Sequence, residues 1–331
     1  MKIRQLISRI AAALSVPLFL GMLGGTADAA SPVSPVVTFD ASRGENPESI
    51  AIDKRGNIYV SMLPTGEIRK IAPDGTQSTL AVLGVGPIPR FLLGLAVDAP
   101  GNVYALLNDV PATRGVWRIS PDGAATRIAP LPSAAQLNAL AFDHRGNLYI
   151  TDSIPGTIYR LAPDGSVVNW LTDPLLKASP TPCGPFPLGL LGANGLAFNK
   201  SGDLFVLNTT LGAVVRIPVA PNGSPGAPAF FVGPNCGLRG LDGQAFDNDD
   251  NLYVAVNIQG KIVRIDPNGN LETIAAAPAD PLFFPTAIAF ETGLGQRKQI
   301  FITNAAPPFL HLGGAPGVVT MDVGVPGRPL P

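Results

Sequence analysis

One short pattern recurs along the chain and constrains the fold more than any other feature. An apolar run, a polar tight turn and a second apolar run appear as ESIAIDKRGNIYVSM, LGLAVDAPGNVYALL, NALAFDHRGNLYITD, NGLAFNKSGDLFVLN and DGQAFDNDDNLYVAV. A second pair of extended runs around a glycine-containing turn follows each one, as in EIRKIAPDGTQSTLA. Asp-Gly and Asn-Gly pairs supply the positive φ that tight hairpin turns need. Each unit is therefore predicted to contain four strands.

The number of units follows from the residue that ends each first strand. These anchors are Asp53, Asp98, Asp143, Asn199, Asp247 and Glu291. They are spaced by 45, 45, 56, 48 and 44 residues, and the 37 glycines and 35 prolines suit a chain that turns this often. Four-stranded repeats of this length stack radially, which predicts an all-β, six-bladed β-propeller. The sixth unit ends before a clear fourth strand, so PVVTFDA near the N-terminus is expected to pair into it and close the ring.

The first thirty residues have a different composition. Lys2, Arg4 and Arg9 precede an apolar run and the small-residue site Ala27-Asp28-Ala29. This is the pattern of a secretory signal peptide, with an uncleaved anchor as the alternative. We therefore expect residues 1–29 to be removed, residues 30–331 to form one propeller domain, and the protein to be secreted or periplasmic. The chain has no basic stripe for nucleic acid, and after cleavage we expect a monomer without a membrane segment.

Equivalent positions can be compared once the repeats are aligned. In a propeller the first strand of each blade lines the central channel, and five residues before each anchor the chain reaches the channel mouth. The six residues there are Glu48, Leu93, Asn138, Asn194, Asp242 and Thr286. Five of the six bear oxygen, whereas their neighbours along the strands are mostly apolar. Two carboxylates and two amides converging from four blades suit a hard divalent cation.

The alternative is that these polar groups satisfy one another and ordered water. Against it, two carboxylates brought together without a cation would repel and raise one pKa. Other chemistries lack their signatures, because the sequence has no GxSxG elbow, no glycine-rich phosphate loop and no paired-cysteine zinc motif.

The mouth residues carry a resemblance to the senescence marker protein (regucalcin) and gluconolactonase family, whose six-bladed propellers hold a divalent metal at the channel mouth. Glu48 in PESIAID, Asn194 in ANGLAF and Asp242 in LDGQAFD match its three metal ligands. Asn138 in LNALAFD matches a further asparagine that faces substrate or metal. Paraoxonase-like propellers use the same residue types around calcium. The resemblance implies Ca²⁺ as the cofactor, with Mg²⁺, Mn²⁺ and Zn²⁺ as alternatives.

Departures from the family pattern bear on the substrate. Ala139 stands where an acidic residue often follows the asparagine, and Gln136 stands where sugar-lactone hydrolases carry arginine. The histidine dyad of paraoxonases has no counterpart, since His144 falls in a turn at the opposite face and His311 lies in the irregular last blade. A sugar acid is therefore disfavoured as the substrate.

Two cysteines flank the predicted site. Cys183 lies in a proline-rich insertion before Asn194, and Cys236 lies in the connection before Asp242. In an oxidising compartment they are expected to form a disulfide, which would close a loop of about fifty residues and contribute about 4 kcal/mol. The apolar residues of the insertion either roof a substrate pocket or pack as an inert surface loop; they are Phe186, Leu188, Leu190 and Leu191.

These features predict an exported metal-dependent hydrolase that cleaves a lactone or another ester-like bond. Glu48, Asn194 and Asp242 would hold the metal, and Asp242 would also serve as general base. Asn138, Thr286 and Leu93 would contact a fairly apolar small-molecule substrate, with the apolar Leu93 leaving an opening at blade two. The rim candidates at the ends of the second strands are Asp152, Asn208, Asn257 and Asn304. A non-catalytic secreted propeller that binds a ligand or protein on the same face is the alternative, and a lyase or isomerase also stays open.

Overall fold

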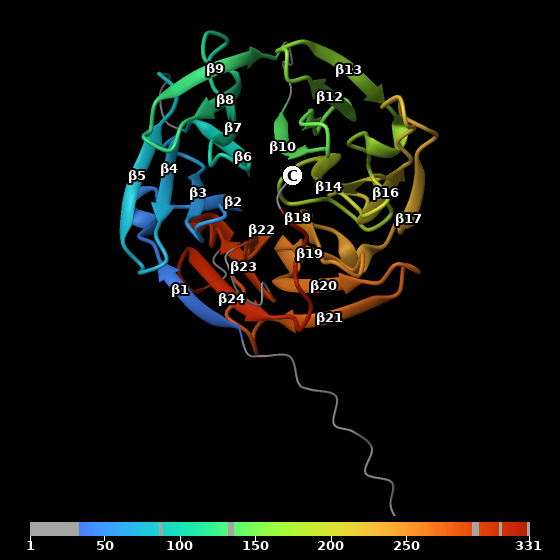
Figure 1. Cartoon of the computed structure of the whole chain (residues 1–331). Helices are drawn as coiled ribbons and strands as arrows, with labels where there is room; N and C mark the ends of the chain where they lie inside the picture. The colour runs from blue at the N-terminus through green and yellow to red at the C-terminus, as the bar shows by residue number, and fades with distance from the viewer. Residues whose placement is uncertain (1–32, 86–88, 132–135, 293–297, 311–312, 330–331) are drawn as a thin grey trace, which may run out of the picture.

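The computed structural model describes residues 33–85, 89–131, 136–292, 298–310 and 313–329. In these residues twenty-four strands form six four-stranded antiparallel sheets. The sheets stand radially around a central channel (Figure 1). The predicted six-bladed β-propeller is therefore confirmed. The predicted signal peptide lies outside the described residues, and within them no helix has the length and apolar character needed to cross a membrane.

Blades one to five each contain four consecutive strands. Blade one comprises β2 (Pro47–Ile52), β3 (Ile58–Met62), β4 (Glu67–Ile71) and β5 (Gln77–Val82). Blade two comprises β6 (Phe91–Val97), β7 (Val103–Asn108), β8 (Gly115–Ile119) and β9 (Ala125–Pro130). Blade three comprises β10 (Leu137–Phe142), β11 (Leu148–Asp152), β12 (Thr157–Leu161) and β13 (Val167–Thr172). Blade four comprises β14 (Ala193–Phe198), β15 (Leu204–Asn208), β16 (Ala213–Ile217) and β17 (Ala229–Val232). Blade five comprises β18 (Leu241–Phe246), β19 (Leu252–Val256), β20 (Lys261–Ile265) and β21 (Leu271–Ala276).

Blade six joins the two ends of the chain. It comprises β22 (Pro285–Phe290), β23 (Gln299–Asn304), β24 (Gly317–Asp322) and the N-terminal β1 (Ser34–Thr38). Strand β1 pairs antiparallel with β24, with Ser34 opposite Thr320 and Thr38 opposite Gly317. The predicted closure of the ring by the N-terminal strand is confirmed, and β1 covers the edge of β24 that would otherwise be unpaired.

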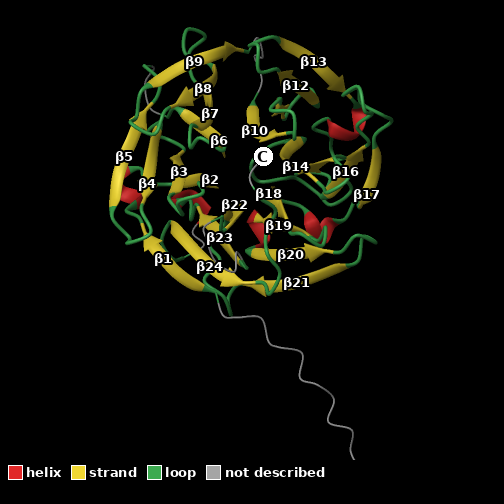
Figure 2. Ribbon diagram, in the orientation of Figure 1, coloured by secondary structure: helices red, strands yellow, loops and turns green. Residues whose placement is uncertain are grey.

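Short 3-10 helices occupy some of the connections between strands (Figure 2). They are η1 (Ala41–Arg43), η2 (Pro174–Leu176), η3 (Cys236–Leu238), η4 (Asn257–Gln259) and η5 (Pro308–Leu310).

The anchor residues close the turns at one end of the channel. Asp53 accepts hydrogen bonds from the backbone N–H groups of Arg55 and Asn57, both at 2.9 Å, and from the hydroxyl of Tyr59 at 3.0 Å. Asp98, Asp143 and Asp247 form the same kind of cage in their own blades. These aspartates shape turns. They fix each first strand, whose other end lies at the opposite mouth.

The hydrophobic core lies between neighbouring blades. One cluster joins Tyr59 and Ile68 of blade one to Leu107 and Ile119 of blade two, and all four are nearly inaccessible to solvent. Burying a side chain of this size contributes about 1.5–3 kcal/mol. Equivalent clusters follow around the ring, so each first strand is held on both sides.

Candidate functional site

A β-bulge in each first strand presents one side chain at the channel mouth. In blade five the pairing of β18 with β19 shifts between Leu241 and Gln244, so that Asp242 and Gly243 fall within the bulge. The same shift occurs in the first strand of every blade. A bulge bends the strand and redirects a side chain out of the ladder. Its repetition explains why the six aligned mouth residues form a ring.

All six predicted mouth residues line one cavity of about 480 Å³. They are Glu48, Leu93, Asn138, Asn194, Asp242 and Thr286. The structure therefore brings together residues from all six blades that the sequence grouped by counting alone. The cavity volume is within the range of small-molecule sites.

Hydrogen bonds orient both asparagine amides. The Nδ2 of Asn194 donates to Thr209 Oγ1 at 2.9 Å, and that hydroxyl donates to the Leu241 carbonyl oxygen at 2.7 Å. Since a hydroxyl has only one proton, Thr209 can only accept from the amide. The Nδ2 of Asn138 donates likewise to Ser153 Oγ at 3.2 Å, which in turn donates to the Ala193 carbonyl oxygen at 2.6 Å. Both Oδ1 atoms are thus left as available acceptors at the mouth.

The two carboxyl groups of the ring perturb each other. Burial and then the charge of Asp242 raise the pKa of Glu48 well above its ordinary value. Burial raises the pKa of Asp242 to about 7, although hydrogen bonds from Asn257 and Asn194 act in the opposite direction. In the Asn257 bond, Nδ2 donates to Asp242 Oδ2 at 2.9 Å. Glu48 Oε2 is buried and has no hydrogen-bond partner among the described residues.

This donor set fits a hard divalent cation. A buried carboxylate oxygen without a partner, a second carboxylate and two oriented amide oxygens are oxygen ligands of the kind that Ca²⁺, Mg²⁺ and Mn²⁺ bind. Within the described part of the chain no three His, Cys, Asp or Glu side chains come together. The candidate set therefore depends on Glu48 and Asp242 together with the amides of Asn138 and Asn194.

Glycines beside the mouth residues let the blades approach one another. A Cβ added to Gly195 would overlap the Asp242 carbonyl oxygen, and a Cβ added to Gly94 would lie 2.7 Å from the Asn138 carbonyl oxygen. The glycine of the Asn-Gly pair that opens blade four therefore has a physical reason. Gly195 allows the backbone of Asp242 in blade five to approach that of blade four beside Asn194.

One wall of the cavity is apolar. Leu93 and Phe91 form it at blade two, and Phe284, Pro307 and Pro308 form it at blade six. Phe284 has a φ of 63°, which is unusual for a bulky side chain. Strained residues of this kind are concentrated at functional sites. The cavity therefore combines a polar ring with a hydrophobic side.

The proline-rich insertion contributes to that hydrophobic side in part. Leu188 and Leu191 line the cavity, which supports the interpretation of the insertion as a roof. Leu190 is 41% exposed, and Phe186 is buried, with the Arg239 guanidinium carbon 5.3 Å from its ring centroid. Only two of the four predicted apolar residues therefore face the cavity.

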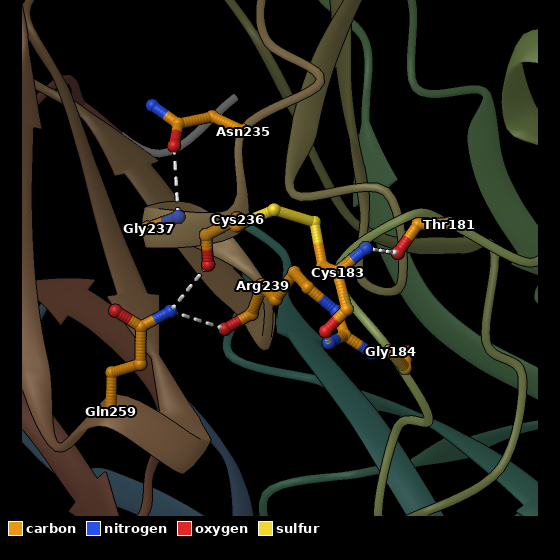
Figure 3. Close-up of a disulfide and its surroundings, with 8 residues drawn as sticks. All are labelled: Thr181, Cys183, Gly184, Asn235, Cys236, Gly237, Arg239 and Gln259. Atoms are coloured by element: carbon orange, nitrogen blue, oxygen red, sulfur yellow. Dashed lines mark hydrogen bonds between the residues drawn. A yellow bond between two sulfur atoms is a disulfide. The ribbon is translucent and has the colours of Figure 1, made fainter.

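The predicted disulfide is present between Cys183 and Cys236 (Figure 3). Arg239 reinforces it, because Nη1 donates to the Cys183 carbonyl oxygen at 2.8 Å and Nη2 to that of Gly184 at 3.0 Å. Gln259 donates to the carbonyl oxygens of Cys236 and Arg239 at 3.2 and 3.0 Å. The insertion is thus tied to the connection that leads into β18 and Asp242.

Of the four rim candidates, only Asn257 lines the cavity. The Nδ2 of Asn208 donates to the Leu175 carbonyl oxygen at 3.0 Å, and the Nδ2 of Asn304 donates to that of Pro281 at 2.7 Å. These asparagines tie loops to the blades, so their assignment to the rim was wrong, as was that of Asp152, which is buried outside the cavity. Strand pairing explains the difference. Asn208 pairs with Ala193, the residue before Asn194, and the corresponding pair in blade five is Val256 with Leu241, the residue before Asp242. Asn257 lies one residue after Val256 and so is not at the position of Asn208.

His144 lies at the opposite end of the channel, as the sequence indicated, and lines a separate cavity there. His311 lies outside the described residues. The sequence did not point to Phe91, Phe284 or the blade-six prolines as part of the site. Phe91 and Phe284 both stand seven residues before their anchors, as do Asn46 and Gln136, which also line the cavity, so counting back seven residues as well as five would have found them. Pro307 and Pro308 lie in a connection outside the repeat.

These features define a class of protein: a six-bladed propeller with an oxygen-lined, partly apolar cavity at one end of its channel. Residues 152–306 match the family described as SMP-30/Gluconolactonase/LRE-like region. The match covers a little under half of the chain and includes Asn194, Asp242 and Asn257. The resemblance inferred from the mouth residues is thereby confirmed.

Solved structures show the same fold. A calcium-binding regucalcin from Agrobacterium tumefaciens is 20% identical, with a TM-score of 0.67 over 91% of this chain and 96% of that one. A luciferin-regenerating enzyme is 18% identical, with a TM-score of 0.67 over 90% and 98% of the two chains. A gluconolactonase from Xanthomonas campestris is 18% identical, with a TM-score of 0.59 over 91% and 99%. No curated protein matches this chain.

Proposed function

We propose that this protein is an exported, divalent-metal-dependent hydrolase that opens a lactone or a similar ester with an apolar body. The observation that carries the proposal is the buried Glu48 Oε2, which has no hydrogen-bond partner among the described residues and lies in a cavity of ligand size beside Asp242, whose charge raises the pKa of Glu48. The match to a family that includes gluconolactonases supports the reaction class. The disulfide is compatible with an oxidising compartment and supports export.

In this proposal Glu48, Asn194 and Asp242 hold the cation, with Ca²⁺ as the first candidate. When bound, a divalent cation polarises an ester carbonyl and lowers the pKa of a water molecule. The Asp242 carboxylate accepts the proton of the attacking water, and Asn257 holds that carboxylate in place through Oδ2. The water oxygen bonds to the carbonyl carbon, the ester C–O bond breaks, and the proton passes to the departing alkoxide.

Substrate orientation comes from the ring and the apolar wall. Asn138 and Thr286 offer polar contacts beside the reacting carbonyl, and Leu93 lies on the hydrophobic side of the cavity. Leu188 and Leu191 extend that side over the mouth. An apolar substituent on the substrate would pack there, which favours such a lactone over a sugar lactone. We also propose that the protein acts as a monomer.

Metal analysis and a hydrolysis screen test this function together. The purified protein should retain a divalent cation, and turnover of aliphatic lactones or aryl esters should be lost on chelation and restored by the cation. Asp242→Asn should lose both metal and turnover, whereas Asp74→Asn, in an exposed turn at the opposite face, should retain both. Metal-free wild-type protein that is inert toward every ester would refute the proposal and favour a non-catalytic binder.

A further inference from the structure

The other end of the channel opens into a second cavity, of about 710 Å³. No described residue lines both cavities. Each blade contributes one alanine to its wall: Ala51, Ala96, Ala141, Ala197, Ala245 and Ala289. In four blades a phenylalanine follows: Phe142, Phe198, Phe246 and Phe290. The result is an apolar sleeve whose volume is within the range of small-molecule sites.

The C-terminal segment delivers an arginine to this cavity. After β24 the chain crosses below blade five, where the Pro326 carbonyl oxygen accepts from the Asn248 N–H at 2.9 Å. Arg328 Nη1 then donates to the carbonyl oxygen of Phe198 in blade four at 2.9 Å. The tail therefore places the half-buried Arg328 at the mouth of the apolar sleeve.

The charges at this mouth are basic. His144, Lys200 and Arg328 line the cavity, and no described lining residue is an aspartate or glutamate. Burial lowers the pKa of Arg328, while nearby Asp250 acts in the opposite sense. Asp250 accepts from the Lys200 backbone N–H at 2.8 Å but does not line the cavity. The cations at the mouth therefore favour an anionic ligand group.

Gln244 also lines this cavity, and its side chain has one acceptor without a hydrogen-bond partner among the described residues. It is 9% exposed, and its Nε2 donates to the carbonyl oxygens of Gly195 at 3.2 Å and Phe205 at 2.7 Å. These two bonds fix the amide, and Oε1 has no partner in the described part of the structure. The equivalent residue in blades two, three and four is leucine: Leu95, Leu140 and Leu196. A buried acceptor that the repeat does not require is matched by a ligand O–H or N–H.

We propose that this end of the channel binds an aliphatic hydroxycarboxylate. The carboxylate pairs with Arg328 and Lys200 at the mouth, the chain lies among the alanines and phenylalanines, and the distal hydroxyl donates to Gln244 Oε1. The Phe246 carbonyl oxygen accepts a hydrogen bond from the Arg328 backbone N–H. Gln244 lies two residues before Phe246 on β18, which is a distance of about 7 Å along the strand. A chain of a few methylene groups spans that distance. Lactone hydrolysis yields this class of compound, but the proposed binding does not depend on that activity.

Calorimetric titration with 6-hydroxyhexanoate tests the site directly. The titration is done in chelator, because the first cavity without metal has two carboxyl groups and no basic side chain among its described lining residues to hold an anion. Wild-type protein should bind 6-hydroxyhexanoate more tightly than hexanoate, and should not bind hexane-1,6-diol, which has no charge. Arg328→Gln should lower the affinity for both carboxylates about tenfold or more, because it removes a charged partner. Arg118→Gln, at an exposed position outside the cavity, should leave both affinities unchanged.

Gln244→Leu tests the contact with the ligand hydroxyl separately from the contact with its carboxylate. The substitution introduces the leucine that blades two, three and four carry at this position. It should lower the affinity for 6-hydroxyhexanoate about three- to tenfold and leave that for hexanoate unchanged. Failure of wild-type protein to bind either carboxylate overturns the proposal, as does unchanged affinity in folded Arg328→Gln. Loss of lactone hydrolysis has no bearing on this result, so the two proposals fail independently.

Discussion

Replacing Asp242 by asparagine should stabilise the metal-free protein at alkaline pH. Burial raises the pKa of Asp242 from 3.8 to about 7, a change of about 3 pH units, or about 4 kcal/mol at most. Because the folded state holds this proton more tightly than the unfolded state, the stabilisation is complete below pH 3.8 and is lost as the pH rises through 7. The pKa of Glu48 is raised in the same direction. Asp242→Asn removes both the Asp242 titration and its repulsion of Glu48.

Thermal unfolding in chelator at pH 5 and pH 8 measures this effect. Of the 4 kcal/mol, about 3 kcal/mol remains at pH 5, which is two units below the raised pKa, and this part is lost by pH 8. For a chain of this size 1 kcal/mol shifts Tm by about 2 °C, so the wild-type Tm should fall between the two pH values by up to about 6 °C more than that of the variant. Added Ca²⁺ at pH 8 should raise the Tm of the wild type and not that of Asp242→Asn. Asp74→Asn, in an exposed turn, should behave as the wild type. Identical pH dependence in wild type and Asp242→Asn would refute the argument that the two carboxyl groups are buried together.

Three further changes test the support of the site. Gly195→Ala should destabilise the fold by about 1–3 kcal/mol and weaken metal binding, because the new Cβ would overlap the Asp242 carbonyl oxygen. Urea unfolding measures the stability and metal titration measures the affinity, and an unchanged unfolding midpoint would contradict the close approach of the two blades. Joint replacement of Cys183 and Cys236 by serine should lower the free energy of unfolding by about 4 kcal/mol, since the disulfide spans 53 residues, and denaturant midpoints with and without reductant provide the check. Leu188→Ser should raise KM for apolar lactones more than for polar ones while retaining metal, and equal effects on both would exclude it from the substrate wall.

Repetition explains how much of the structure could be predicted from sequence. Six copies of one strand pattern specified the blade count and the ring closure, and the same alignment placed Glu48 and Asp242 together although they are far apart in the chain. The β-bulge that redirects these side chains recurs in every blade, so counting back from the anchors identified the mouth without knowledge of its geometry.

The features that could not be predicted are those present in single copies. The leucines that the insertion adds to the hydrophobic wall lie in a loop that occurs once, and its conformation depends on tertiary contacts. Asn257 and Asn208 resemble each other in sequence, but their positions in the strand pairing differ by one residue. As a result Asn257 donates to the Asp242 carboxylate, whereas Asn208 donates to the Leu175 carbonyl oxygen. The orientation of the Asn194 amide required the positions of Thr209 and of the next blade.

The pairing of β1 with β24 has a consequence for the order of the chain. Since the first and last strands pair within one blade, both ends of the chain meet in blade six, and the ring of blades is closed. The polypeptide could therefore begin elsewhere. A circular permutant that links the present termini and opens at Gly75, in an exposed turn where an added Cβ would contact no other residue within 4 Å, should still assemble both cavities.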